Sequence, residues 1–179
     1  MLKTNLMPIV CSFILLLGLA VAAAGAQPGG AASDITKKQN AGVLQQLPFA
    51  DKQDFEDAQR GFIAPLPEGG VIRNKAGQPV WDFSSFSFIK EGAAAPDTVN
   101  PSLWRQSQLL TAAGLFKVID RVYQVRGADA SNITFIEGDN GIIVVDPLIS
   151  AECARVALDL YYRHRPKKPN PPLKNRPIA

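Results

Sequence analysis

The clearest pattern of apolar and polar positions lies between residues 122 and 163. Val122–Arg126 and 132–137 are short runs rich in β-branched and aromatic residues, which predicts two strands. Ile142–Val145 is apolar at every position, and this indicates a third strand that is covered on both faces. The segment 138–141 predicts a tight hairpin turn in which its Asn-Gly pair adopts positive φ values.

An amphipathic helix is predicted after these strands. Ser150 can cap its start. Its apolar side is formed by Cys153, Val156, Ala157, Leu160 and Tyr161. Antiparallel strands that lead into a buried strand and then a helix are the opening unit of an α/β layered fold. The unit is incomplete, because the 16 residues after Arg163 cannot supply the additional sheet that it needs.

Shorter elements are predicted before this unit. They are a helix over 51–60 ended by Gly61, a hairpin of strands 71–73 and 79–83, and a helix from Asn100 and Pro101 to near Gly114. The aromatic residues expected in the core are Trp81, Phe83, Phe86, Phe88 and Trp104.

The first 26 residues have the pattern of a secretory signal peptide. Lys3 precedes an apolar run over 9–24, and small residues at 24–26 suit signal peptidase. The run is shorter than the ~20 residues that span a bilayer, so we expect no stable membrane span. The mature chain should begin near Gln27 in the periplasm or outside the cell, and 27–46 is expected to be a flexible leader.

Charge is distributed unevenly along the chain. Residues 163–179 carry six basic and no acidic side chains, whereas 27–162 carry 12 basic and 16 acidic ones. Because the basic residues are at the end and not on a folded face, this distribution argues against a nucleic-acid-binding domain. Residues 167–179 form a basic, proline-rich tail, which we interpret as a native extended terminus or as the product of a lost reading frame.

The inventory of catalytic side chains is small. His164 is the single histidine, so neither a Ser-His-Asp triad nor a multi-ligand zinc site can be assembled from this sequence. Cys153 is the one cysteine beyond the signal segment, which excludes an internal disulfide. The acidic run 54–57 is interpreted as a solvated helix face. No catalytic, cofactor-binding or metal-binding residue is therefore assigned.

Six segments carry a resemblance to a known family. They are 54–64, 98–106, 114–118, 123–127, 137–150 and 160–166. They resemble the amino-terminal part of the linear primary alkylsulfatases of the metallo-β-lactamase superfamily, and the similarity covers 47–169. The resemblance implies an α/β fold, here an incomplete αββα sandwich preceded by a helix and hairpin extension. It also implies a secreted or periplasmic homodimer that hydrolyses dodecyl sulfate and similar long-chain primary alkyl sulfates with two zinc ions.

The same resemblance locates a missing part. In that family an apolar strand leads into an H-x-H-x-D-H loop that begins the zinc site, but here Asn170, Pro171 and Pro172 replace the strand. The expected organisation is a signal peptide (1–26), a leader (27–46), an extension (47–120), the start of the metallo-β-lactamase-like domain (121–166) and the tail (167–179).

Two functional hypotheses follow. In the first, the chain is a truncated or frameshifted alkylsulfatase that is itself inactive and binds no zinc. In the second, it is a non-catalytic exported protein whose basic tail binds anionic surfaces. In either case the unfinished core predicts marginal folding and a tendency to associate.

Overall fold

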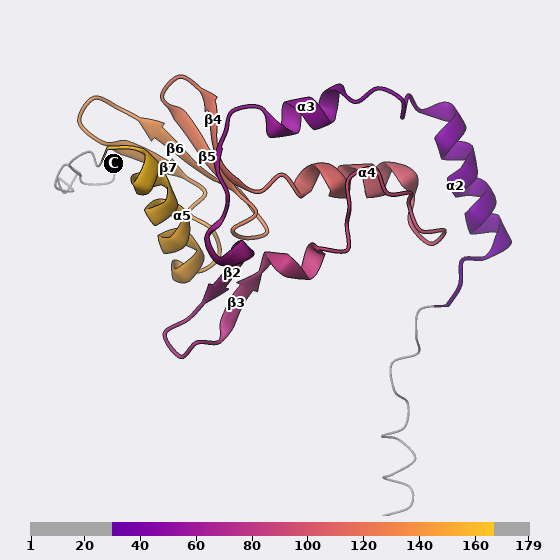
Figure 1. Ribbon diagram of the computed structural model, residues 1–179, viewed down its shortest axis with the longest axis horizontal. Helices are drawn as coiled ribbons and strands as arrows, with labels where there is room; N and C mark the ends of the chain where they lie inside the picture. The colour runs from indigo at the N-terminus through magenta and orange to yellow at the C-terminus, as the bar shows by residue number, and fades with distance from the viewer. Residues whose placement is uncertain (1–29, 167–179) are drawn as a thin grey trace, which may run out of the picture.

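The computed structural model describes residues 30–166 (Figure 1). The predicted signal peptide, the start of the leader and the basic tail lie outside the described residues. The helices are α2 (Asp34–Gln46), α3 (Gln53–Gln59), α4 (Pro101–Leu110) and α5 (Ala151–His164), with 3₁₀ turns η1 (Pro67–Gly70) and η2 (Phe83–Phe86). The strands are β1 (Phe62–Ala64), β2 (Val71–Arg73), β3 (Pro79–Asp82), β4 (Gly114–Ile119), β5 (Val122–Arg126), β6 (Ile133–Glu137) and β7 (Ile142–Val145).

Five of these strands form one antiparallel sheet in the order β1-β4-β5-β6-β7. β2 and β3 form a separate antiparallel hairpin. β1 lies against β4 because Gly61, with φ of 75°, turns the chain where any side chain would clash with the carbonyl oxygen of Lys117. The sheet therefore combines two strands of the predicted extension, β1 and β4, with three strands of the predicted domain.

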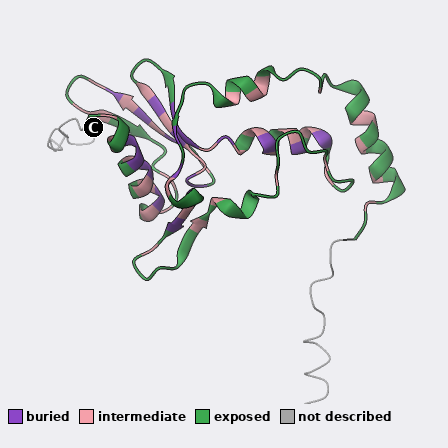
Figure 2. Cartoon of the chain, in the orientation of Figure 1, coloured by how far each residue is buried: buried purple, intermediate pink, exposed green. Residues whose placement is uncertain are grey.

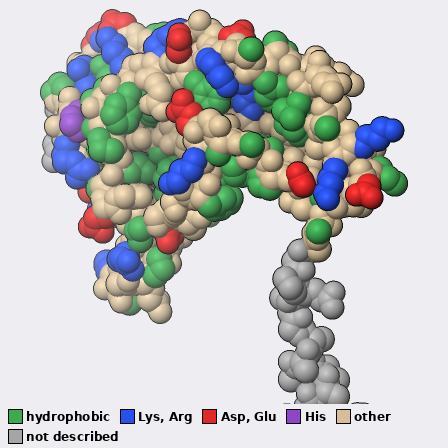
Figure 3. Space-filling model, turned by 45° about the vertical axis from the view of Figure 1, so that its right-hand side comes forward, with side chains coloured by type: hydrophobic (Ala, Val, Ile, Leu, Met, Phe, Trp, Pro, Cys, Tyr) green, Lys and Arg blue, Asp and Glu red, His purple; other side chains and the backbone are tan. Residues whose placement is uncertain are grey.

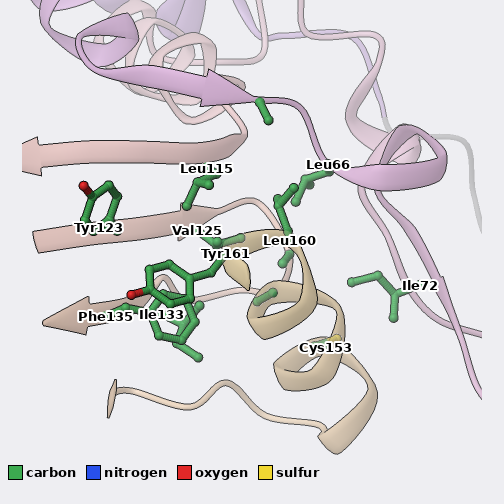
Figure 4. Close-up of a cluster of buried hydrophobic side chains, with 13 residues drawn as sticks. Leu66, Ile72, Leu115, Tyr123, Val125, Ile133, Phe135, Cys153, Leu160 and Tyr161 are labelled. Atoms are coloured by element: carbon green, nitrogen blue, oxygen red, sulfur yellow. The ribbon is translucent and has the colours of Figure 1, made fainter. Parts of the chain in front are cut away.

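Helix α5 covers one face of the sheet. The Ser150 hydroxyl accepts from the amide of Cys153 at 3.1 Å, as the predicted cap requires. Tyr161 lies between the helix and the sheet, with its ring stacked 4.5 Å from Phe135. Figure 4 shows the resulting core, to which Cys153 and Leu160 contribute from α5.

Helices α2, α3 and α4 form an arm that extends away from the sheet (Figure 1). Arg105 of α4 holds α3 to it by donating to Asp54 at 2.6 and 2.7 Å and to the carbonyl of Phe49. Asn40 of α2 donates to the carbonyl of Asp97 at 2.9 Å. Buried residues in the arm are confined to α4, and α2 and α3 have none (Figure 2).

Three expectations about local structure were wrong. Residues 34–46 are helical and not part of a flexible leader, because Ser33 caps a segment rich in lysine and glutamine. β7 is an edge strand with Val144 and Val145 42% and 49% exposed, so nothing within residues 30–166 covers it on both faces. The hairpin turn does form, but Asn140 has no positive φ.

The predicted helix over 51–60, the hairpin and the Asn100 cap are confirmed, although α3 and α4 are shorter than expected. Of the expected core aromatics, Trp104 is buried, whereas Phe86 and Phe88 are 39% and 65% exposed. No helix within residues 30–166 is long and apolar enough to cross a membrane.

Candidate functional site

An apolar cleft of about 460 Å³ lies where the hairpin, the end of α4 and the loop after β5 meet. Its walls are mostly apolar side chains: Trp81, Phe83, Phe86, Ile89, Leu109 and Leu110. Figure 3 shows hydrophobic side chains gathered on the hollowed face between the sheet and the arm. The volume is within the range of about 300–1,000 Å³ that small-molecule sites occupy. We call it the aromatic cleft.

The hairpin is held against the sheet at this cleft. The indole of Trp81 donates to the carbonyl of Gly127 at 2.8 Å. Gly127 has a φ of 78°, and a side chain there would clash with Ala113 and Phe83. Only glycine permits this close approach of loop and hairpin, so the cleft depends on it.

Arg126 is the cation of the aromatic cleft. Its Nε donates to Gln124 at 2.7 Å, its Nη1 donates to the carbonyl of Ala58 at 3.1 Å, and its guanidinium lies 4.2 Å from the ring centroid of Phe116. Among the described residues no carboxylate forms an ion pair with it. Burial lowers the pKa of Arg126 from its usual value. A guanidinium has five N–H donors, so donors remain for a ligand.

Asp129 also lines the cleft, but its oxygens are engaged by the backbone. It is 8% exposed and accepts from the amides of Ala130 and Ile149 at 2.6 and 2.7 Å. These bonds tie the loop after β5 to the segment that precedes α5. Asp129 therefore supports the cleft wall rather than providing a reactive carboxylate.

A buried carboxylate lies on the other face of the sheet. Glu137 accepts from the Tyr161 hydroxyl at 2.9 Å and from two nitrogens of Arg165 at 2.8 and 3.0 Å. Burial, with a contribution from Glu137, raises the pKa of Tyr161 above its usual value, so its phenol stays protonated and donates. The hydrogen bonds from Tyr161 and Arg165 to Glu137 anchor the end of α5 to β6, so the role of Glu137 is structural.

The side chains considered from sequence are dispersed. His164 is exposed at the end of α5, and Cys153 is buried in the core. Asp54 is paired with Arg105, which lowers the pKa of its carboxyl mainly through their hydrogen bonds. Asp57 pairs with Arg60. Asp54 and Asp57 of the acidic run thus form ion pairs within the arm, and Glu56 accepts from Gln53.

The described residues do not fit a zinc site. No group of three His, Cys, Asp or Glu side chains within 30–166 could hold a metal ion. Burial raises the pKa of the Cys153 thiol, whereas zinc binds the thiolate.

Sequence reasoning missed the aromatic cleft. Its walls come from three separated segments, and Arg126 appears in the sequence only as the last residue of a strand. Trp81, followed closely by Phe83 and Phe86, was the available signal.

No protein-family model matches the chain. Over 161 residues it is 54% identical to a linear primary-alkylsulfatase from Pseudomonas sp, a match that covers 90% of this chain and 23% of that protein. It is 56% identical over 138 residues to an (R)-specific secondary-alkylsulfatase from Pseudomonas sp, covering 77% and 20%. It is 50% identical over 134 residues to an alkyl/aryl-sulfatase from Saccharomyces cerevisiae, covering 75% and 20%.

The solved structure of a stereoselective inverting sec-alkylsulfatase from Pseudomonas sp superposes with a TM-score of 0.70 at 56% identity. The match covers 79% of this chain and 22% of that one. It confirms the expected α/β class as part of a larger alkylsulfatase fold. The chain is similar to alkylsulfatases and spans about a fifth of the length of the curated relatives it matches.

Proposed function

We propose that this chain forms one α/β layer of a hydrolase for long-chain primary alkyl sulfates and does not cleave them by itself. The observation that carries the proposal is the 54% identity to a linear primary-alkylsulfatase over 90% of this chain. The fold supports it as well, because Ile143 and Val145 on the face of the sheet opposite α5 are 61% and 49% exposed. Such a face suits the metallo-β-lactamase-like sandwich, in which a second layer would cover it.

The proposal assigns metal binding to residues outside this chain. The resemblance implies two zinc ions, and the chain has a single histidine, exposed at the end of α5. Export to the periplasm and homodimer formation belong to the same proposal, on the basis of the signal-like segment 1–26 and the resemblance.

A segment exchange tests the proposal. This chain's matching residues replace those of the Pseudomonas linear primary-alkylsulfatase, and three proteins are compared: this chain, the parent enzyme and the chimera. We expect the chimera to bind zinc and to release sulfate from dodecyl sulfate, and this chain to do neither. Zinc-dependent hydrolysis by this chain alone, or a folded and zinc-loaded chimera without activity, would overturn the proposal.

The second candidate is a non-catalytic exported protein that binds anionic surfaces. The six basic residues and absence of acidic ones over 163–179 favour it. Binding to vesicles that contain anionic lipid, lost at high salt and on deletion of 167–179, together with an inactive chimera, would support this candidate over the first.

A further inference from the structure

The hairpin turn between β6 and β7 carries the single Asn-Gly pair of the sequence, Asn140 and Gly141. Asn140 is exposed, and no hydrogen bond in the described part of the chain engages its side chain. Within residues 30–166 the amide of Gly141 also has no hydrogen-bond partner, while its carbonyl accepts from the amide of Gly138 at 2.8 Å. A free side-chain amide therefore lies beside a free backbone amide, and the second residue has no Cβ to hinder their approach.

The asparagine in the turn between β2 and β3 is held in place instead. The Oδ1 atom of Asn74 accepts from the amides of Ala76 and Gln78, each at 3.0 Å, and its Nδ2 donates to the Gln78 side chain at 3.3 Å. These bonds fix the orientation of the side chain, and the residue that follows, Lys75, has a Cβ. The two turns thus present the same residue type in a fixed and in a free state.

We propose that Asn140 is a site of spontaneous deamidation, which converts it to aspartate and isoaspartate. The nitrogen of Gly141 forms a bond to Cγ of Asn140, the bond between Cγ and Nδ2 breaks, and ammonia leaves with the proton of the Gly141 amide. The resulting five-membered succinimide ring takes up one water molecule and opens at either of its two carbonyls. The reaction needs water and no oxidant, cofactor or enzyme. The proposal concerns this chain alone and does not rest on the proposed function.

The two products differ in their effect on β7. Among the described residues this edge strand pairs only with β6, and Glu137 with Ile142 is the pair nearest the turn (Figure 1). Aspartate keeps the length of the backbone and adds a carboxylate beside Asp139, which is paired with Arg121. Isoaspartate adds a methylene group to the main chain of the turn. Because the turn fixes the register of a hairpin, isoaspartate should weaken the pairing of β7 with β6, and aspartate should preserve it.

Incubation of the full chain at pH 8, followed by peptide mapping with mass spectrometry, tests the site. Lys75→Gly is the matched control, because it places the same dipeptide in the β2–β3 turn, where the side chain of Asn74 is held. In native buffer we expect Asn140 to lose its amide nitrogen at least fivefold faster than Asn74 does in this variant. In concentrated urea the two rates should become equal. Equal rates in native buffer, or a faster loss at Asn74, would overturn the proposal.

The attack by the Gly141 nitrogen is tested separately. Gly141 has no positive φ, so its backbone conformation suits alanine, but the added Cβ hinders the approach of the nitrogen to Cγ of Asn140. Gly141→Ala should slow the loss of the amide at Asn140 at least fivefold. A rate equal to that of the wild type would contradict the succinimide route.

Hydrogen exchange at residues 142–145 measures the consequence for β7. In incubated wild-type protein, the isoaspartate content is measured by methylation with an isoaspartyl methyltransferase, and exchange at β7 should rise with that content. Asn140→Asp carries the same charge on a normal backbone and should exchange at the rate of fresh wild type. Unchanged exchange in isoaspartate-rich protein, or equally fast exchange in Asn140→Asp, would contradict the effect assigned to the longer main chain.

Discussion

On the face of the five-stranded sheet that α5 covers, Tyr123, Val125 and Phe135 are 3% exposed or less, whereas Ile143 and Val145 on the opposite face are 61% and 49% exposed. Both sets are apolar and both lie on neighbouring strands of one sheet. The face alone does not set the difference, because Val144 on the α5 side of edge strand β7 is 42% exposed and Phe116 on the opposite face of β4 is fully buried. Burial follows what packs against each side chain. Apolar surface contributes to folding only where another element removes it from water.

The largest test of this comparison removes the central side chain that α5 packs against the covered face. Tyr161→Ala deletes a fully buried ring that packs on Phe135 and Tyr123, and it should lower the free energy of unfolding by about 3–5 kcal/mol. Urea denaturation followed by circular dichroism measures the change.

Ile143→Ala on the open face is the matched control. It removes a side chain that remains largely in water, so we expect a loss below about 1 kcal/mol. Equal losses at Tyr161 and Ile143 would show that the open face is covered in solution, for example by self-association.

A smaller effect is expected from the buried carboxylate that joins α5 to β6. Glu137→Gln keeps the shape of the side chain but leaves Arg165 without its charge partner, and Tyr161 keeps a weaker acceptor. Because the Arg165 side chain is 33% exposed, water replaces part of the interaction, and the loss should be about 2 kcal/mol.

Tyr161→Phe isolates one of these contacts. It removes only the hydroxyl that donates to Glu137 and should cost about 1 kcal/mol. Additive losses in the double variant with Glu137→Gln would contradict a shared network, because coupled groups show an interaction energy in such a cycle.

The smallest effect concerns pH and the arm. Arg105 lowers the pKa of Asp54 below its ordinary value of 3.8, so the pair stabilises the folded state above that pH, and this contribution is lost as pH falls through the folded pKa. Asp54 is 38% exposed in this pair, so screening limits the contribution to below about 1 kcal/mol. Comparing wild type with Asp54→Asn by urea denaturation across a pH series should show a difference that is full at pH 7 and shrinks as the pH falls below 3.8. A difference that does not change with pH would assign the effect to the hydrogen bonds and not to the charge.

Local signals in the sequence were sufficient for several elements. Asn100 and Ser150 cap helices as expected, since capping needs only a side-chain oxygen close to free amides in the chain. The β-branched runs of β5 and β6 and the apolar side of α5 were likewise recognised from periodicity. Residues 34–46 form a helix although their composition is typical of a flexible leader, because the Ser33 side chain caps the segment.

Strands β1 and β4 and the aromatic cleft were not identified. β1 has three residues and gains its structure from pairing with β4, more than 50 positions away in the chain. The cleft likewise combines residues from the hairpin, α4 and β5. Neither has a local pattern, because both arise from contacts between distant segments.

The sequence by itself determined the helices capped by Asn100 and Ser150, strands β5, β6 and β7, the shortage of metal ligands and the alkylsulfatase resemblance, because each depends on residue type and short-range spacing. Only the tertiary structure decided which apolar strand residues are buried. It showed that Ile142–Val145 is an edge strand with an open face, although its composition is that of a core strand. It also brought Arg126 together with aromatic side chains more than 40 positions away, since burial and charge pairing are properties of neighbours in space.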